Sequence, residues 1–192
     1  KTSSKFHHLI WCLYEIYQQT QTNLNFSIRI ASHMKPDDTD WELLATLQRD
    51  ASPSNQALAE QVRISPPTAL RRVRRLHEEG LIERQVALLD EDRIAALQGH
   101  GLTAIVEVTL DRQGAEHLEA FERRAVQDDA VRQCYRVAPG PDFVLIVRVH
   151  DMPAYQALAE RLFTQDANVR NVRSFFSVKR AKFETQVPLA RG

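Results

Sequence analysis

The sequence SNQALAEQVRISPPTALRRVRRLHEE, at residues 54–79, predicts two short helices joined by a tight turn. Ser54 is suited to cap the first helix, because its hydroxyl can accept a hydrogen bond from a free backbone N–H. Ser65 can cap the second helix, and Pro66 stands at its first position, where a missing N–H costs little. Gly80 then ends the second helix. The stretch therefore has the form of a helix-turn-helix.

The second of these helices is expected to be buried on one side and basic on the other. Ala69, Val73 and Leu76 recur at i, i+4 and i+7, which predicts a buried stripe. Successive residues of a helix are about 100° apart. Pro67, Arg71 and Arg75 are therefore expected to point away from the core, with Thr68 and Arg74 at the margins of this side. Arg72 is expected nearer the edge of the core.

A helix of this kind fits the recognition helix of a DNA-binding unit. Arginine can fork onto a guanine edge or neutralise a phosphate, and threonine can contact a base or a phosphate. The alternative is a solvated basic face on an ordinary bundle helix; the SPP turn, both caps and the preceding short helix favour DNA. The residues expected at the DNA are Asn55, Ser65, Pro67, Thr68, Arg71, Arg72, Arg74 and Arg75.

Composition limits the class of protein. The 192 residues allow one large or two small domains, and the formal net charge of zero means that DNA binding must come from local clusters of charge. Cys12 and Cys134 form neither a disulfide framework nor a metal motif, which fits a reducing cytoplasm. The apolar runs are too short to span a membrane. No phosphate loop, HExxH or CxxC occurs and the histidines lack ligand spacing, so we expect no enzyme activity, cofactor or metal.

Residues 1–33 differ in composition from the rest of the chain. They are rich in Gln, Asn, Thr, Ser and Ile, whereas the remainder is rich in Ala, Arg, Leu and Asp. Two explanations are favoured over a functional native extension. Met34 can be the true initiator, with the upstream sequence translated by misannotation, or the segment can derive from a vector, in which His-Met is a common junction.

Residues 38–50, DTDWELLATLQRD, predict a helix that precedes the helix-turn-helix. Asp38 or Asp40 can cap it, and acidic residues suit its positive end. The face expected toward the core of a three-helix domain consists of three apolar residues: Trp41, Leu44 and Leu47.

The segment after Gly80 is expected to leave this domain as a strand. Residues 81–89 alternate partly, with Ile82, Val86 and Leu88 on one side, which predicts a wing or a hinge strand. Residues 90–101 predict a linker with one helical turn. The domain division expected is 1–33 as the extension, 34–88 as a winged helix-turn-helix, 89–101 as the linker and 102–187 as a second domain.

The second half of the chain alternates between strands and helices. Strands are expected at 102–110, 130–137, 143–149 and 169–178, and helices at 114–127 and 153–164. The strand at 143–149 is nearly all apolar, which indicates a central place in the sheet. The order βαββαβ is the ferredoxin-like plan, so the fold class is α+β. Helices cover one face of such a sheet, and a second subunit is the usual cover for the other.

A winged helix-turn-helix followed by a βαββαβ domain resembles the Lrp/AsnC family of leucine-responsive, or feast/famine, regulators. The resemblance covers about residues 35–187. In the first half its motifs are DDTD at 37–40 before LLATLQRDA, LAEQV at 58–62, ISP at 64–66, RVRRL at 72–76 and EGLI at 79–82. In the second half they are VRQCYRV at 131–137, DFVL at 142–145 and DMPAY at 151–155.

The resemblance implies a transcription factor that binds double-stranded DNA and forms a homodimer through its C-terminal sheet. It also implies assembly into tetramers, octamers or higher forms, and an amino-acid effector in a cleft between C-terminal domains. The expected targets are genes of amino-acid metabolism or transport. A module that senses amino acids and acts through protein contacts is the alternative, but the arginine-rich helix, which such modules lack, favours the regulator.

The effector positions implied by the family motifs are Arg136, Pro139, Gly140, Asp142, Met152 and Phe175. The chain departs from the family pattern at Pro139, where a glycine is usual, and Gly140 follows one position later. Proline removes an N–H that could hold a carboxylate. Asp142 can hold an α-ammonium group or simply cap the turn, and the sequence leaves both roles open.

Overall fold

The computed structural model describes residues 35–99 and 101–189, and the chain divides into two compact units. Leu89–Lys182 form one unit, and the rest of the described chain forms the other. The proposed origins of residues 1–33 concern positions outside the described residues. Within the described part of the chain, no helix is both long enough and apolar enough to cross a membrane.

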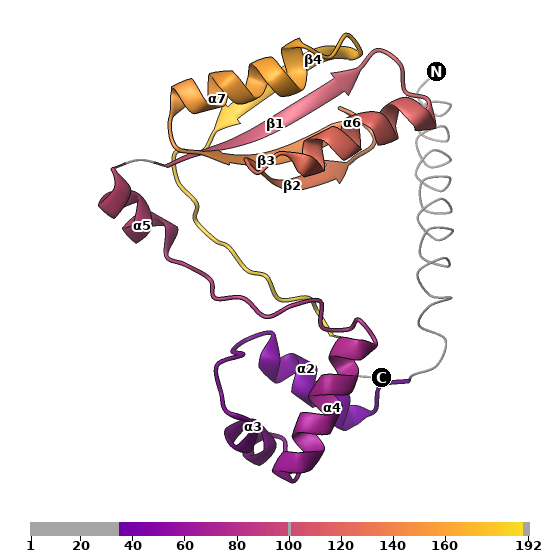
Figure 1. The fold of residues 1–192 in the computed structure, drawn as a ribbon, viewed down its shortest axis with the longest axis vertical. Coiled ribbons are helices and arrows are strands. Elements are labelled where there is room, and N and C mark those ends of the chain that lie inside the picture. Colours follow the sequence, from indigo (N-terminus) through magenta and orange to yellow (C-terminus); the bar gives the residue numbers. More distant parts are fainter. Residues whose placement is uncertain (1–34, 100, 190–192) are drawn as a thin grey trace, which may run out of the picture. The chain divides into compact units, whose positions relative to one another are not determined.

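The first unit is built from three helices, α2 (Asp38–Leu47), α3 (Asn55–Gln61) and α4 (Pro66–Glu78), drawn from indigo to magenta in Figure 1. Its buried core comes from all three: Leu43, Leu58, Val62 and Leu76, with Leu44, Leu47, Ile64, Val73 and Ile82 packed at the edge. The face predicted for α2 was right for two residues. Trp41 lies outside this cluster, and Leu43 occupies the buried position instead.

Each helix begins with a cap, and two of the caps differ in detail from expectation. The Ser54 hydroxyl accepts from the Ala57 amide at 3.2 Å, as predicted. Helix α2 is capped by Asp37 and not by Asp38 or Asp40; the Asp40 side chain completes a reciprocal capping box. Ser65 does occupy the N-cap of α4, but its side chain makes no capping bond to the backbone.

The turn between α3 and α4 closes on itself through a left-handed residue. Arg63 has φ +56°, its amide donates to the Glu60 carbonyl, and the Ile64 amide donates to the Ala59 carbonyl at 2.9 Å. This is a Schellman ending, which usually uses glycine. Gly80, at φ +73°, ends α4 in the same manner, which confirms it as the terminator.

Residues 81–89 do not form the predicted strand. No strand occurs anywhere between residues 35 and 99, and the side chains of Val86, Leu88 and Leu89 are all more than 60% exposed. A strand requires a hydrogen-bonded neighbour, and alternation in the sequence does not supply one. The linker expected at 90–101 holds more than one turn of helix: α5 (Glu91–Gln98) is capped by Asp90 and ends at Gly99, φ +86°.

The second unit has the predicted βαββαβ order. Its elements are β1 (Leu102–Leu110), α6 (Ala115–Gln127), β2 (Val131–Arg136), β3 (Phe143–Val149), α7 (Met152–Ala159) with the π-helical turn η1 (Glu160–Thr164), and β4 (Val169–Phe176). The sheet order is β2-β3-β1-β4, with every neighbouring pair antiparallel. The central position predicted for residues 143–149 is confirmed.

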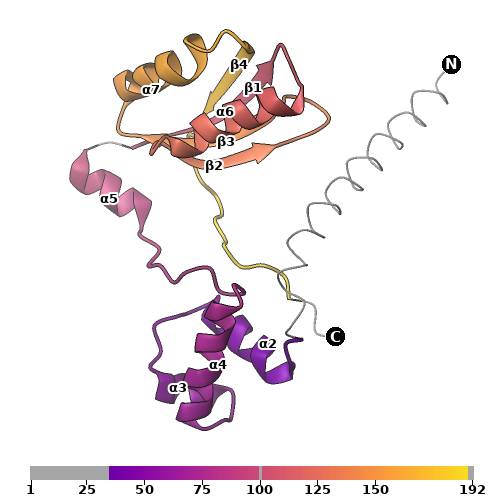
Figure 2. The ribbon, with the colours of Figure 1, turned by 45° about the vertical axis from the view of Figure 1, so that its right-hand side comes forward.

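Helices α6 and α7 cover one face of this sheet (Figures 1 and 2). The buried core lies between them and the two central strands, and consists of Ala104, Val106, Val108, Leu110, Phe121, Ala125, Phe143, Leu145, Val147, Tyr155, Leu158, Leu162 and Phe163. Alternate side chains of the strands therefore point to the opposite face.

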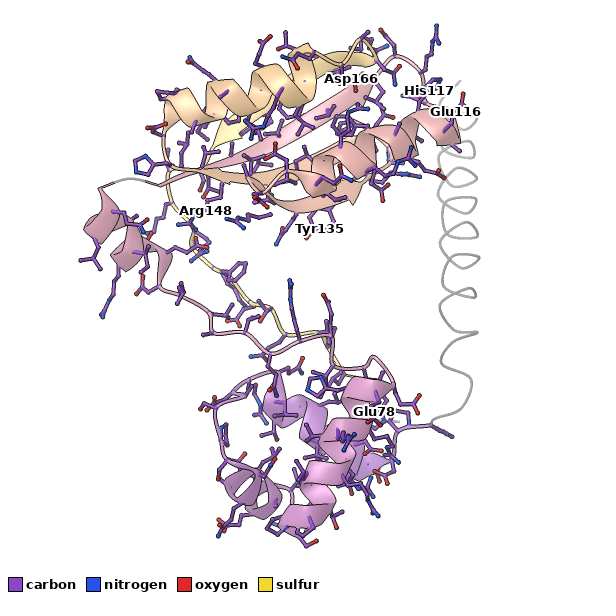
Figure 3. All side chains as sticks on the ribbon, viewed as in Figure 1. Glu78, Glu116, His117, Tyr135, Arg148 and Asp166 are labelled. Atoms are coloured by element: carbon purple, nitrogen blue, oxygen red, sulfur yellow. The ribbon has the colours of Figure 1, made fainter. Side chains whose placement is uncertain are left out.

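That opposite face, which we call the open sheet face, carries apolar side chains. Ile105 is 41% exposed and Phe175 is 45% exposed, and they are direct partners across β1 and β4. Ile146 is the partner of Ile105 on the other side. Tyr135, opposite Val144, lies on the side of the sheet away from α6 and α7 (Figure 3).

The chain after β4 returns to the first unit. Residues 183–189 cluster with the helical unit and not with the sheet that precedes them. They carry no regular structure as far as residue 189. The Val187 amide donates to Oε1 of Gln48, the residue that ends α2, at 3.0 Å.

Candidate nucleic-acid interface and ligand site

One side of α4 is exposed in the described part of the chain. Pro67, Leu70, Arg71 and Arg74 are exposed, and their spacing of i, i+3, i+4 and i+7 places them on one face, which we call the outward face of α4. Arg74 is 79% exposed, and among the described residues its ion pair is with Glu78, one turn along the helix, at 2.9 Å. Figure 3 labels Glu78 at the end of α4.

Arg71 is the cation of this face that has no competing partner. It makes no hydrogen bond or ion pair through its side chain to any residue in the described ranges. Its charge is therefore available to a phosphate or to a guanine edge.

The other two arginines of α4 are engaged inside the unit. Asp40 is only 1% exposed, and its carboxylate accepts from Arg72 Nη1 at 2.9 Å and from Arg75 Nη2 at 2.7 Å. Arg72 also donates to Asp37 at 2.8 Å. The Nε atoms of both arginines are buried and have no hydrogen-bond partner among residues 35–99 and 101–189. The two guanidinium groups thus compensate a buried carboxylate at the start of α2.

This arrangement corrects the orientation predicted for Arg75. The side chain was expected to point directly away from the core, with Arg74 at the margin. Arg75 instead bends to Asp40 and is 43% exposed, whereas Arg74 is the outward residue. Long side chains can bend along a surface to reach a charge, and position along a helix does not reveal this. Arg72 does lie near the core edge, as predicted, at 22% exposure.

Hydrogen bonding shifts the pKa values of Asp37 and Arg72 in this cluster. The hydrogen bond from Arg72 holds the pKa of the Asp37 carboxyl below its ordinary value of 3.8, helped by the Asp40 amide. The same bond, together with Asp40, raises the pKa of Arg72. Both groups are charged at neutral pH, so the link between α2 and α4 is ionic.

The remaining predicted DNA contacts lie at the starts of helices. Ser65 and Thr68 join their hydroxyls at 2.8 Å across the first turn of α4, and Asn55 is exposed at the start of α3. The structure thus gathers Pro67, Arg71 and Arg74 on one face. DNA contact by each of the eight residues stays a prediction. Leu70, exposed on the same face, was missed because an apolar residue gave no signal of recognition.

In the second unit, Asp142 lies at the end of the loop between β2 and β3 and is hydrogen-bonded to β1. Its amide donates to the Val108 carbonyl at 2.9 Å, and its carboxylate accepts from the Leu110 amide at 2.6 Å. The side chain therefore anchors the loop to the end of β1. In the loop, Pro139 is exposed, and Gly140 has φ +136°, a conformation that side chains other than glycine's rarely adopt.

The other three predicted effector residues lie apart. Arg136 pairs with Glu122 of α6 at 2.6 Å, whereas Phe175 is on the open sheet face. Met152, 43% exposed, begins α7 after β3 has ended. Strand β3 separates Met152 from the loop of Asp142, and its seven residues span about 20 Å. A single copy of the domain does not bring the six residues together.

Two cavities of this unit lie elsewhere. One, of about 350 Å³, is formed by α7, η1 and β4, with Tyr155 and Phe163 among its lining residues. The other, of about 620 Å³, includes Asp128, Arg148 and Arg161. Figure 3 labels Arg148 at the sheet. Neither cavity contains any of the predicted effector residues. In residues 35–99 and 101–189, no group of three or more His, Cys, Asp or Glu residues could hold a metal ion.

Two family models match the chain. Residues 36–83 match a winged helix-turn-helix DNA-binding model, and residues 103–187 match the Lrp/AsnC ligand binding domain. The Bkd operon transcriptional regulator of Pseudomonas aeruginosa is 34% identical over 153 residues, which cover 80% of this chain and 97% of that protein.

Solved structures agree with these matches. An AsnC family transcriptional regulator from Agrobacterium tumefaciens has a TM-score of 0.71 and 29% identity, covering 80% of this chain and 97% of that one. A transcriptional regulator of Neisseria meningitidis in complex with L-Met has a TM-score of 0.71 and 27% identity, with the same coverage. These similarities extend over both units, and this chain belongs to the Lrp/AsnC family of DNA-binding transcriptional regulators, which are not enzymes.

Proposed function

We propose that this protein binds duplex DNA through the outward face of α4 and regulates genes of amino-acid metabolism or transport in response to an amino acid. The observation that carries the DNA contact is the charge of Arg71, which pairs with none of the described residues, beside the exposed Arg74 on a helix whose other side is buried. The Bkd operon regulator and the L-Met complex are relatives that support the amino-acid connection. A transcriptional regulator works in the compartment that holds the chromosome, so we propose that this protein is cytoplasmic.

The four arginines of α4 have different parts in this proposal. Arg71 and Arg74 meet the DNA directly. Arg72 and Arg75 hold α4 against the start of α2 through Asp40, and so fix the angle at which the outward face is presented. Asn55, Ser65 and Thr68, near the starts of α3 and α4, supply neutral donors to the phosphate backbone.

The DNA contact can be tested with matched variants of the full chain. Arg71→Ala should weaken binding to a duplex selected by the wild type from a random-sequence pool, as measured by fluorescence anisotropy. If Arg71 contacts a phosphate, the slope of log affinity against log salt should also fall by about 0.9. Arg123→Ala is the control, because Arg123 is an exposed arginine of α6, 67% exposed, on the other unit.

Two outcomes would count against this reading. Unchanged affinity of Arg71→Ala would remove the outward face of α4 from the interface. Failure of the wild type to retain any duplex from the pool would favour the alternative, an amino-acid sensor that acts through protein contacts.

The open sheet face supports self-association. Ile105, Ile146 and Phe175 form a continuous apolar strip across three strands, and the pair Glu107–Arg173, at 3.3 Å, lies beside it. Water-exposed apolar area of this kind is stabilised by burial against another surface. We propose that a second copy covers it, and that such homodimers assemble into tetramers, octamers or higher forms.

Assembly also explains how the effector positions can act together. Because Met152 and the loop of Asp142 lie at opposite ends of β3, one site can use both only if they come from different copies. We propose that the amino acid binds in a cleft between C-terminal domains. Light scattering with a panel of amino acids tests this: one amino acid should change the mass and the DNA affinity. No change with any of them would mean that this chain has lost effector control.

A further inference from the structure

We propose that Leu70 reads thymine in the DNA site, through contact with the C5 methyl group of that base. This inference rests on the proposed contact of the outward face of α4 with DNA. It adds a specificity-determining residue to a face on which only polar and charged residues, with Pro67, were expected to act.

Leu70 has no part in the core of its own unit. The buried cluster and the residues packed at its edge do not include it, and it is 53% exposed. It lies one turn after Pro67 and one turn before Arg74, with Arg71 beside it, so it occupies the middle of the outward face. A large apolar side chain at this position remains in contact with water until a partner covers it.

The neighbouring charges select the kind of partner. Arg71 and Arg74 flank Leu70, and neither pairs with a buried carboxylate of the described residues. Two copies of this face would bring like charges together, which disfavours self-association here. A polyanion is favoured instead. In the major groove of DNA, the thymine methyl is the apolar group on a base edge, so it is the chemical partner of a leucine side chain among arginines.

The test removes single methyl groups from the DNA. Duplexes selected by the full-length wild type are remade with deoxyuridine in place of each thymine in turn, which keeps base pairing and removes only the methyl. At one or two positions the wild type should lose affinity about fourfold, the change that burial of one methyl-sized group accounts for. Leu70→Ala should bind the unmodified duplex more weakly and be indifferent to deoxyuridine at those positions.

Leu81→Ala serves as the control, since Leu81 is an exposed leucine, 44% exposed, beyond the end of α4. It should behave as the wild type in both measurements. Thermal melting should show Leu70→Ala folded, because Leu70 lies outside the core.

Different results would refute thymine contact by Leu70 and DNA binding by the outward face of α4. If Arg71→Ala weakens binding but no deoxyuridine substitution does, the α4 interface stands and the role of Leu70 is refuted. A selected site without thymine also refutes it. So does a Leu70→Ala protein that keeps full sensitivity to deoxyuridine, since the methyl would then be read by another residue. If neither Leu70 nor Arg71 matters, the outward face is not the interface.

Discussion

Replacing the buried Asp40 with asparagine should destabilise the helical unit by about 2–4 kcal/mol. The Asp40 carboxylate accepts from Arg72 at 2.9 Å, from Arg75 at 2.7 Å and from the Asp37 amide at 3.1 Å. Asparagine keeps the shape but offers one acceptor oxygen, and its amino group must face a guanidinium donor. At least one charged hydrogen bond is lost, and two cations then lack their shared anion.

The size of this effect follows from burial. Hydrogen bonds to charged groups contribute roughly 1.5–3 kcal/mol each, and breaking a buried ion pair costs roughly 3–5 kcal/mol. The arginines are 22% and 43% exposed, so water screens part of the loss and the upper end is not reached. Asp37→Asn is the matched control: its carboxyl is 54% exposed, and asparagine caps a helix as well as aspartate. It should cost less than about 1 kcal/mol.

Urea unfolding of the full chain measures both changes. Trp41 lies in α2 next to Asp40, so its fluorescence reports on the helical unit, and a Trp11→Phe background removes the other tryptophan. Two results would contradict this prediction: an Asp40→Asn stability within about 0.5 kcal/mol of the wild type, or a loss no larger than that of Asp37→Asn. Either result would mean that the buried carboxylate does not hold α4 to α2.

Three further changes probe the second unit. Asp142→Ala should cost about 1–3 kcal/mol by leaving the Leu110 amide without its acceptor, and should speed hydrogen exchange of that amide. The hydrogen bond from Arg161 holds the pKa of the Asp128 carboxyl below its ordinary value of 3.8. This pair therefore stabilises the folded protein fully above pH 3.8, and its contribution is lost as the pH falls through the lowered pKa of the folded state. Asp128→Asn should remove this loss of stability in acid, which can be measured by comparing the urea unfolding midpoints of variant and wild type at about pH 6 and about pH 3. Ile105→Glu on the open sheet face should lower the mass seen by light scattering while the circular dichroism spectrum stays unchanged; an unaltered mass would exclude this face as the dimer interface.

Much of the second unit could be predicted from the sequence because its signals are local. The strands Leu102–Leu110 and Phe143–Val149 begin and end at the predicted residues, since alternation and a continuous apolar run are properties of consecutive positions. The helix predicted at 114–127 is also present, with Gly114 as its N-cap. The order of elements then determines the topology.

The failures arise where a distant partner decides the outcome. Residues 81–89 alternate like a strand, yet the described part of the chain offers no neighbouring strand to pair with them. The direction of Arg75 depends on Asp40, which precedes it by 35 residues. Similarly, the role of Asp142 depends on the Leu110 amide across the sheet. The periodicity of apolar residues shows which side chains share one face of a helix or strand, but it does not identify the residues that this face contacts.

The return of residues 183–189 to the helical unit changes how fragments of this protein should be designed. A chain cut after residue 88 contains the three helices but lacks the segment whose Val187 amide bonds to Gln48. A chain cut at residue 182 keeps the sheet complete and yet removes part of the other unit. The helical unit is thus discontinuous in sequence, and a fluorescent label attached to residues 183–189 would report on the end of the protein that binds DNA.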